Sequence, residues 1–182
     1  VRTGAATTPI SVKIRPVTAC ASRFEVAPDT SFDASADGHL VSITSAMVDF
    51  MASPDELAAI LAHELAHNIL RHRERLDAAG ITRGLLQQFG RNARLTKATE
   101  IEADRLSIWL MVNAGYDPQA AIRFWTRFGK QHGKGIFSAP THYRWKKRVG
   151  LLEEEIARLA AARRTEQGYL PPLMAAPPPP LD

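Results

Sequence analysis

The chain has 182 residues, of which 45% are hydrophobic and 23% are charged. These values are ordinary for one globular domain and exclude wholesale disorder and a collagen-like structure. A single cysteine, Cys20, excludes an internal disulfide framework and is expected to be chemically inert. The 23 Lys and Arg exceed the 19 Asp and Glu by four, which is too small an excess to indicate a nucleic-acid partner.

No run of apolar residues is long enough to predict a membrane span. The best candidate, residues 57–70, is interrupted by two histidines, a glutamate and an asparagine. The chain begins with Val1 rather than Met, so a signal or an anchor can have preceded it.

The first fifty residues are predicted to form short strands. Apolar and polar residues alternate over 10–14, which is the period of a half-buried strand, and residues 24–26 form a second candidate. Residues 32–35 and 40–44 flank an Asp-Gly pair that is typical of a hairpin turn, so these two segments are predicted to pair. We expect residues 40–44 to form an exposed edge strand, to which an extended substrate could add.

Beyond residue 53 the pattern becomes helical. Ser53 can cap a helix, Pro54 suits its first position and Glu56 completes a capping box, so a helix is predicted from there to about Leu76. The remaining predicted segments are a helix from Thr96 or Thr99 to Ala114, a helix from Asp117, a glycine-rich loop at 129–140 and a helix over 141–164. We assign residues 1–170 to a single domain and the proline-rich residues 171–182 to a disordered, extended tail.

The most informative motif lies inside the first of these helices. Each helical residue rotates about 100°, so the imidazoles of His63 and His67 lie about 40° apart and can reach one zinc ion. Glu64 lies at the edge of the same face, where it can touch a water held by the metal. The neighbouring apolar residues predict a buried helix, in which three ionisable groups are costly without a metal. A metal site is therefore favoured over a chance coincidence on a solvated helix.

A third zinc ligand is expected from the acidic segment Glu100-Ile101-Glu102-Ala103-Asp104. Glu100 and Asp104 share one helical face, whereas Glu102 points about 200° away from Glu100 and cannot share that site. One of Glu100 and Asp104 therefore binds the metal, and the other can orient a histidine. Without the histidine motif, these acids would be interpreted as a solvated helix start.

The other histidines and the tryptophans are interpreted as structural. His72 lies about 180° from His63 around a continuous helix, which predicts a surface or second-face contact rather than a metal ligand. His39 is expected to be solvated and His132 to be a polar loop residue. The three tryptophans are expected in the core or at its edge; they are Trp109, Trp125 and Trp145.

Together these motifs resemble peptidase family M48, a family of zinc metallopeptidases. The motifs are His63-Glu64-Leu65-Ala66-His67 followed by His72, then Glu100-x-Glu102-Ala103-Asp104, then Thr141-His142 with Arg148 six residues later. The segment from Gly38 to Ile43 also resembles the strand that precedes the family's active helix. The resemblance covers about residues 24–160.

The resemblance implies a role for each site residue and a fold. The ligands of one zinc per chain would be His63, His67 and Glu100; Glu64 would be the base and Asp104 an outer partner of a ligand. His142 would lie near the metal as transition-state stabiliser or reversible fourth ligand, although Tyr143 stands where the family usually has proline. Arg148 and Tyr143 are weaker candidates for stabilising the oxyanion. The implied fold is α+β and zincin-like, with a small antiparallel sheet packed on a mainly helical body.

The implied function is zinc-dependent hydrolysis of peptide bonds in unfolded or misassembled proteins. A polypeptide substrate is expected, with no nucleic-acid partner and with peripheral membrane association as an option. Because the family's transmembrane helices are absent from the chain, we expect its soluble branch and a bacterial periplasmic or cell-envelope location.

Two other functions stay open at this point. The chain could be a zinc-containing chaperone or assembly factor with little proteolysis, which Glu64→Gln separates because client binding would survive that change. It could also be a basic surface module for anionic lipid or nucleic acid, which steep salt dependence of binding would indicate. The arginines of such a module would be Arg71, Arg73, Arg75, Arg83, Arg91 and Arg94.

Overall fold

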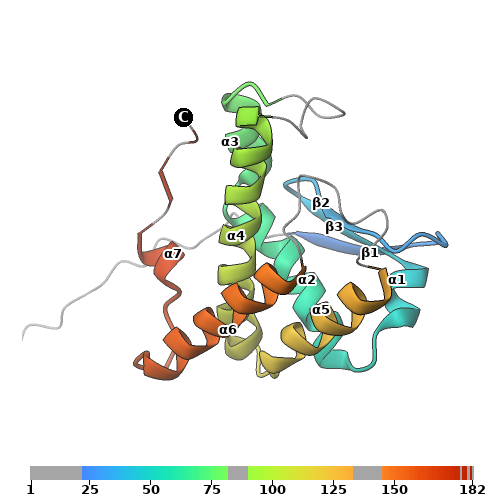
Figure 1. Cartoon of the computed structure of the whole chain (residues 1–182). Helices are drawn as coiled ribbons and strands as arrows, with labels where there is room; N and C mark the ends of the chain where they lie inside the picture. Colours follow the sequence, from blue (N-terminus) through green and yellow to red (C-terminus); the bar gives the residue numbers. More distant parts are fainter. Residues whose placement is uncertain (1–21, 82–89, 133–144, 177, 180, 182) are drawn as a thin grey trace, which may run out of the picture.

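A small sheet packs against one side of a mainly helical body (Figure 1). The structure is a computed structural model that describes residues 22–81, 90–132, 145–176, 178, 179 and 181. The three strands are β1 (Arg23–Ala27), β2 (Ala34–Ala36) and β3 (Leu40–Thr44). The predicted α+β, zincin-like fold class is confirmed by this arrangement.

The sheet is mixed rather than wholly antiparallel. Strands β2 and β3 form the predicted antiparallel hairpin, but β1 pairs with β3 in parallel, so the strand order is β1-β3-β2. The prediction that residues 40–44 form an exposed edge is therefore wrong. Because β1 hydrogen-bonds to the other side of β3, this strand is central, and its Val41 and Ile43 are buried. The strand predicted at 10–14 lies outside the described residues.

The helices follow the predicted order with shifted ends. They are α1 (Ser45–Phe50), α2 (Pro54–Ile69), α3 (His72–Ala78), α4 (Gly90–Asn113), α5 (Gln119–His132), α6 (Trp145–Ala161) and α7 (Pro172–Ala175). Helix α4 begins before the predicted threonines, and α5 continues into the segment predicted as a glycine-rich loop. The rest of that loop, 133–144, lies outside the described residues.

The two ends of α2 explain how it carries the histidine motif. At the start, the Ser53 hydroxyl accepts a hydrogen bond from the Glu56 backbone N–H, and the Glu56 carboxylate accepts one from the Ala52 N–H. At the end, Arg71 adopts the left-handed conformation with φ 53°, so the helix predicted to reach about Leu76 stops at Ile69. Helix α3 restarts at His72, and the chain changes direction between the two helices.

Helix α2 lies between the sheet and α4, where it also contacts α5 (Figure 1). Ala66 and Ala103 are completely buried in the cluster that joins α2 to α4. Small side chains at a helix crossing allow a short distance between the axes, and they bring the polar faces of the two helices together here. Buried Ile43 and Met47 join Ile60 in a second cluster, which fixes α2 against the sheet.

The C-terminal segment makes defined contacts. Residues 172–175 form the short helix α7, and Leu173 packs against the cluster of Ala66 and Leu70. Arg75 donates a hydrogen bond to the backbone carbonyl of Pro179 over 3.0 Å. Part of the segment expected to be extended is thus helical and packed. Among the described helices, none has the length and apolar character needed to cross a membrane.

Candidate metal centre

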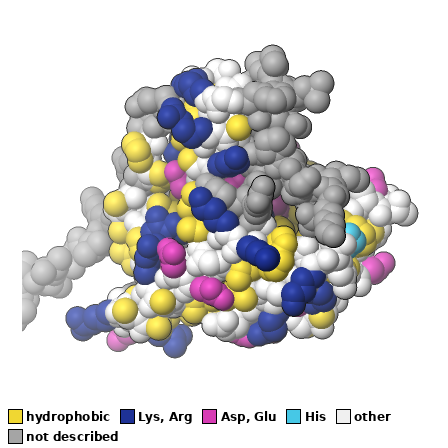
Figure 2. Space-filling model, viewed as in Figure 1, with side chains coloured by type: hydrophobic (Ala, Val, Ile, Leu, Met, Phe, Trp, Pro, Cys, Tyr) yellow, Lys and Arg dark blue, Asp and Glu magenta, His cyan; other side chains and the backbone are white. Residues whose placement is uncertain are grey.

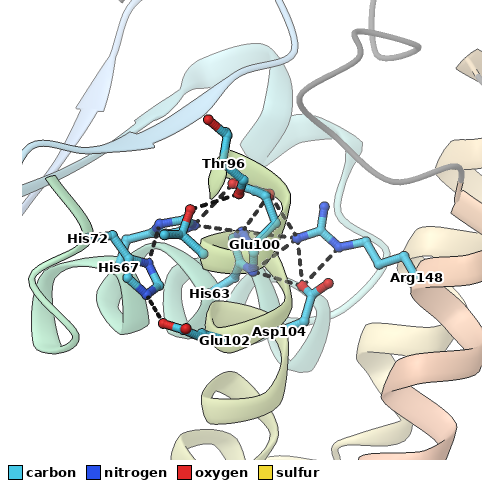
Figure 3. A network of polar contacts seen from close by, with 9 residues as sticks. His63, His67, His72, Thr96, Glu100, Glu102, Asp104 and Arg148 are labelled. Carbon is cyan, nitrogen blue, oxygen red and sulfur yellow. Dashed lines mark hydrogen bonds and ion pairs between the residues drawn. The ribbon is translucent and has the colours of Figure 1, made fainter. Parts of the chain in front are cut away.

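Side chains from two crossing helices converge at one point (Figure 3). His63 and His67 come from α2, and Glu100 comes from α4. One donor atom from each lies within 4.8 Å of the others. The Nε2 atoms of the two histidines are 3.2 Å apart, and Nε2 of His67 lies 3.5 Å from Oε1 of Glu100. The two imidazoles and one carboxylate are the donor set that catalytic zinc sites use, so these residues fit the expected metal.

His63 is held from behind by a carboxylate. Oδ1 of Asp104, one turn beyond Glu100 on α4, lies 2.9 Å from Nδ1 of His63. Arg148 of α6 donates to the same oxygen from Nε at 2.9 Å and Nη2 at 2.6 Å. The Arg148 guanidinium also lies 3.7 Å from the ring centre of Trp125. Arg148, one of the weaker oxyanion candidates, is therefore buried and directed toward Asp104.

The electrostatics of His63 follow from these neighbours. Burial and the Arg148 cation each act to lower its pKa, but Asp104 and Glu100 act in the opposite direction, so the pKa rises to about 9. Arg148 Nη2 lies 3.0 Å from each ring nitrogen of His63, and Asp104 offsets this positive charge. A metal ion bound at Nε2 of His63 must therefore replace a proton.

His67 is held by a second histidine. Nδ1 of His72 lies 2.8 Å from Nδ1 of His67, and Nε2 of His72 lies 3.0 Å from Oε2 of Glu102. Arg75 donates to both oxygens of Glu102, at 2.5 and 3.3 Å. The expectation of a surface position for His72 is wrong, since its side chain is almost completely buried. Burial lowers the pKa of His67 well below its ordinary value, so its ring is neutral at pH 7.

Glu64 directly follows His63 on α2. Burial raises its pKa to about 7; the carboxylates of Glu100 and Asp33 act in the same direction, and His63 and Arg148 oppose them. Asp33 directly precedes β2, so the sheet contributes to the electrostatics of the site. A carboxyl group whose pKa is near neutrality can accept and return a proton at physiological pH.

Two further predictions bear on this site and on the surface. His142 lies outside the described residues, so its role stays a prediction. Of the arginines suggested for a basic surface, Arg71 pairs with Glu74 and Arg75 with Glu102. Figure 2 shows basic side chains spread among acidic and hydrophobic ones over the face in view, without a continuous stripe.

Sequence reasoning missed the contacts of His72, Glu102 and Arg75 with the site. The prediction treated residues 53–76 as one helix, which places His72 on the far side from the metal. The left-handed conformation of Arg71 interrupts this helix, so His72 points in another direction. A positive φ at an arginine has no clear signal in the sequence. Glu102 is not part of the group of donor atoms, and its contact with the site runs through His72.

Comparison with known proteins gives one family and several relatives. A model of peptidase family M48 matches residues 21–93. The mitochondrial metalloendopeptidase OMA1 of Schizosaccharomyces pombe is 31% identical over 153 residues, covering 72% of this chain and 45% of the relative. OMA1 of Arabidopsis thaliana is 30% identical over a match that covers 64% of this chain and 27% of the relative. OMA1 of Saccharomyces cerevisiae is 32% identical over a match that covers 54% of this chain and 34% of the relative. The chain spans less than half of the length of these relatives.

The relatives also correct one expectation. A bacterial periplasmic or cell-envelope location is wrong, because the matched proteins are named as mitochondrial enzymes of eukaryotes. The expected cofactor is confirmed, since peptidases of this family are zinc-dependent and the His-His-Glu set is present. The motifs, the ligand geometry and the matches lead to one conclusion: the chain belongs to peptidase family M48.

Proposed function

We propose that the chain is a zinc metalloendopeptidase domain in which His63, His67 and Glu100 hold one zinc ion. The observation that carries the proposal is the convergence of these three donors at the crossing of α2 and α4 (Figure 3). Glu64 is close enough to His63 and Glu100 for their charges to act on its pKa. The sequence similarity to metalloendopeptidases from three eukaryotes supports the same reaction class.

The residues of the site suit peptide hydrolysis. Zinc, when bound, polarises the scissile carbonyl and makes a water more acidic. Glu64 accepts the proton of the attacking water and returns it to the leaving amine, a role that its pKa of about 7 favours. Asp104 and Arg148 keep the ring of His63 in place. His142 remains our candidate for stabilising the oxyanion, on the basis of the family resemblance alone.

Unfolded or misassembled proteins are the substrate class that we propose. A protease that binds its substrate as an added strand needs an extended segment, which an unfolded chain offers. Because β3 is central, the addition would occur at β2, whose neighbour Asp33 influences Glu64 and which contacts α2. Among the described strands, β3 is the only partner of β2.

Glu64→Gln in the full chain tests the proposal. The variant should keep one zinc per chain, because Glu64 is not a ligand, and it should lose hydrolysis of a casein-like substrate, because an amide cannot accept the proton. Glu74→Gln, which removes an exposed carboxylate from α3, is the matched control and should leave both unchanged. Full turnover by zinc-loaded Glu64→Gln, or a wild-type chain without zinc, would contradict the proposal.

The same variant addresses the alternative of a zinc-containing chaperone. A chaperone would protect an unfolded client equally well as the wild type and as Glu64→Gln, and the wild type would release no new peptide termini. Release of such termini by the wild type alone favours the peptidase. The relatives are named for endopeptidase activity, and that evidence does not favour the chaperone.

A further inference from the structure

We propose that His72 and Glu102 are positioning residues that fix the ring of His67 as a zinc ligand. This inference rests on the proposed function, since it takes His67 to be a ligand. It concerns two residues that the donor group itself does not include. The contacts run in a single line from His67 to the partly buried ion pair of Glu102 with Arg75, as Figure 3 shows for the two histidines and Glu102.

The direction of each hydrogen bond in this line follows from the chemistry of imidazole. Nε2 of His67 faces Nε2 of His63 and the Glu100 carboxylate, so a metal there would use the lone pair on that atom. A neutral imidazole has one N–H, so the proton of His67 must then lie on Nδ1. The partner of this N–H is Nδ1 of His72, 2.8 Å away, which must therefore be an acceptor.

Because Nδ1 of His72 accepts a hydrogen bond, the position of the proton on the His72 ring is also determined. With a lone pair on Nδ1, neutral His72 has its N–H on Nε2, which lies 3.0 Å from Oε2 of Glu102. An ionised carboxylate only accepts hydrogen bonds, so Glu102 is compatible with this one arrangement and not with the reverse. Arg75 donates to both carboxylate oxygens and keeps Glu102 ionised and in place.

The local backbone shows that this line depends on an unusual conformation. On a continuous helix, residues five apart differ in direction by about 140° and their rings do not meet. Arg71, at φ 53°, ends α2 and lets α3 direct His72 back to His67. A left-handed conformation in a residue other than glycine costs free energy and is retained where the surrounding contacts require it. The buried contact of His72 with His67 is such a requirement.

Two substitutions of His72 separate positioning from simple space filling. An asparagine places its amide near Nδ1 of the imidazole and can still accept from His67. A glutamine places its amide near Nε2 and keeps the contact with Glu102 but has no acceptor for His67. We expect His72→Gln to weaken zinc binding by about 10- to 100-fold, and His72→Asn to remain within about threefold of the wild type.

The measurement is the zinc dissociation constant of the full chain, obtained by competition with a chelator. The absorption spectrum of the cobalt-substituted protein is the second readout, because it responds to a change in the orientation of a ligand. Glu102→Gln should weaken zinc binding about tenfold. Glu74→Gln changes the same charge on the exposed side of α3 and should have no effect. Thermal melting shows whether each variant is folded.

The outcomes separate this inference from the proposed function. Wild-type zinc affinity in His72→Gln and in Glu102→Gln would overturn the positioning roles. Equal losses in His72→Asn and His72→Gln, with equal melting temperatures, would also overturn them, because they would indicate packing alone. If both His72 variants fail to fold, Glu102→Gln decides. If His67→Ala binds zinc as tightly as the wild type, the ligand assignment of the proposed function fails instead.

Discussion

The two histidines of α2, His63 and His67, differ in the group that contacts Nδ1 of the ring. Behind His63 is a carboxylate, Asp104, in direct contact at 2.9 Å. Behind His67 is a neutral imidazole, that of His72, and the carboxylate of Glu102 comes only after it. Each line ends at an arginine, Arg148 in the first and Arg75 in the second.

This difference separates orientation from charge. A carboxylate in contact with a ligand histidine fixes the ring and also makes its metal-binding nitrogen more basic. An intervening neutral ring transmits the hydrogen bond but keeps the negative charge one residue further away. The carboxylates of both lines come from α4. Asp104 lies four residues after Glu100 and Glu102 lies two after it, so they are on different faces of that helix. A single helix thus supplies the carboxylates that support both proposed ligands, one from each of two faces.

Replacing a proposed zinc ligand should have the largest effect on zinc binding, and this effect should be the same for His63 and for His67. Replacing either His63 or His67 with alanine removes one of three donors and should abolish stoichiometric zinc. The loss should exceed the about 10- to 100-fold loss that is usual for outer contacts. Metal analysis of the purified variants measures this. A double variant that still contains one zinc per chain would show that the ion binds elsewhere.

Asp104 should matter more than Glu102, because only Asp104 touches a ligand. Asp104→Ala should weaken zinc binding or activity by about 10- to 100-fold, and Glu102→Ala should have an effect at the lower end of that range. Asp104→Ala also leaves the buried Arg148 without its main acceptor, which adds to the loss. Chelator competition on the two variants side by side gives the ratio. A larger loss for Glu102→Ala would reverse the order that we infer from the contacts.

A substitution far from the metal site should affect the contacts that support His63 and leave those that support His67 unchanged. A Cβ on Gly129 would lie 2.2 Å from the Trp145 ring, so Gly129→Ala must displace the start of α6, which carries Arg148. Neither His72 nor Glu102 lies on α5 or α6. We expect a several-fold fall in activity, with the chemical shifts of His63 altered and those of His72 unchanged. Gly150→Ala, whose added Cβ has open space, is the control and should resemble the wild type.

The predictable part of the site is the part that depends on helix periodicity. His63, His67, Glu100 and Asp104 each lie within an uninterrupted helix, so their spacing alone predicts which of them share a face. The start of α2 was equally predictable, because Ser53 and Glu56 act through local contacts.

The rest depends on contacts distant in sequence or on backbone angles without a residue signature. The parallel pairing of β1 with β3 joins residues about 17 positions apart, and the alternating pattern of a strand does not specify its direction. The bend at Arg71 reverses the expected position of His72. Arg148 approaches Asp104 from α6, 44 positions later in the chain, which only the packing of α6 on α4 can bring about.

The smallest effect on the metal should come from Glu155, which joins α6 to α4 away from the ligands. Its carboxylate accepts hydrogen bonds from Trp109 at 2.7 Å and from Arg105 at 2.9 Å, and its side chain is buried. Burial acts to raise the pKa of Glu155, but the hydrogen bonds from Trp109 and Arg105 outweigh it, so the pKa is below its ordinary value of 4.5. Glu155→Gln should therefore lower the free energy of unfolding by about 1–3 kcal/mol at pH 7 while changing zinc affinity little.

The pH dependence of that loss identifies its origin. A carboxyl group whose pKa is lower in the folded than in the unfolded protein stabilises the fold above its ordinary pKa, and the stabilisation disappears as the pH falls through the folded value. The gap between wild type and Glu155→Gln should thus be constant at neutral pH and narrow below 4.5, where the unfolded wild type begins to take up the proton. Urea unfolding of both proteins from neutral to acidic pH measures the gap. A gap that stays constant through the acidic range would show that Glu155 acts by shape alone. Glu155 would then contribute no charge to the packing of α6 on α4, and Asp104 would be the charged partner that holds Arg148 there.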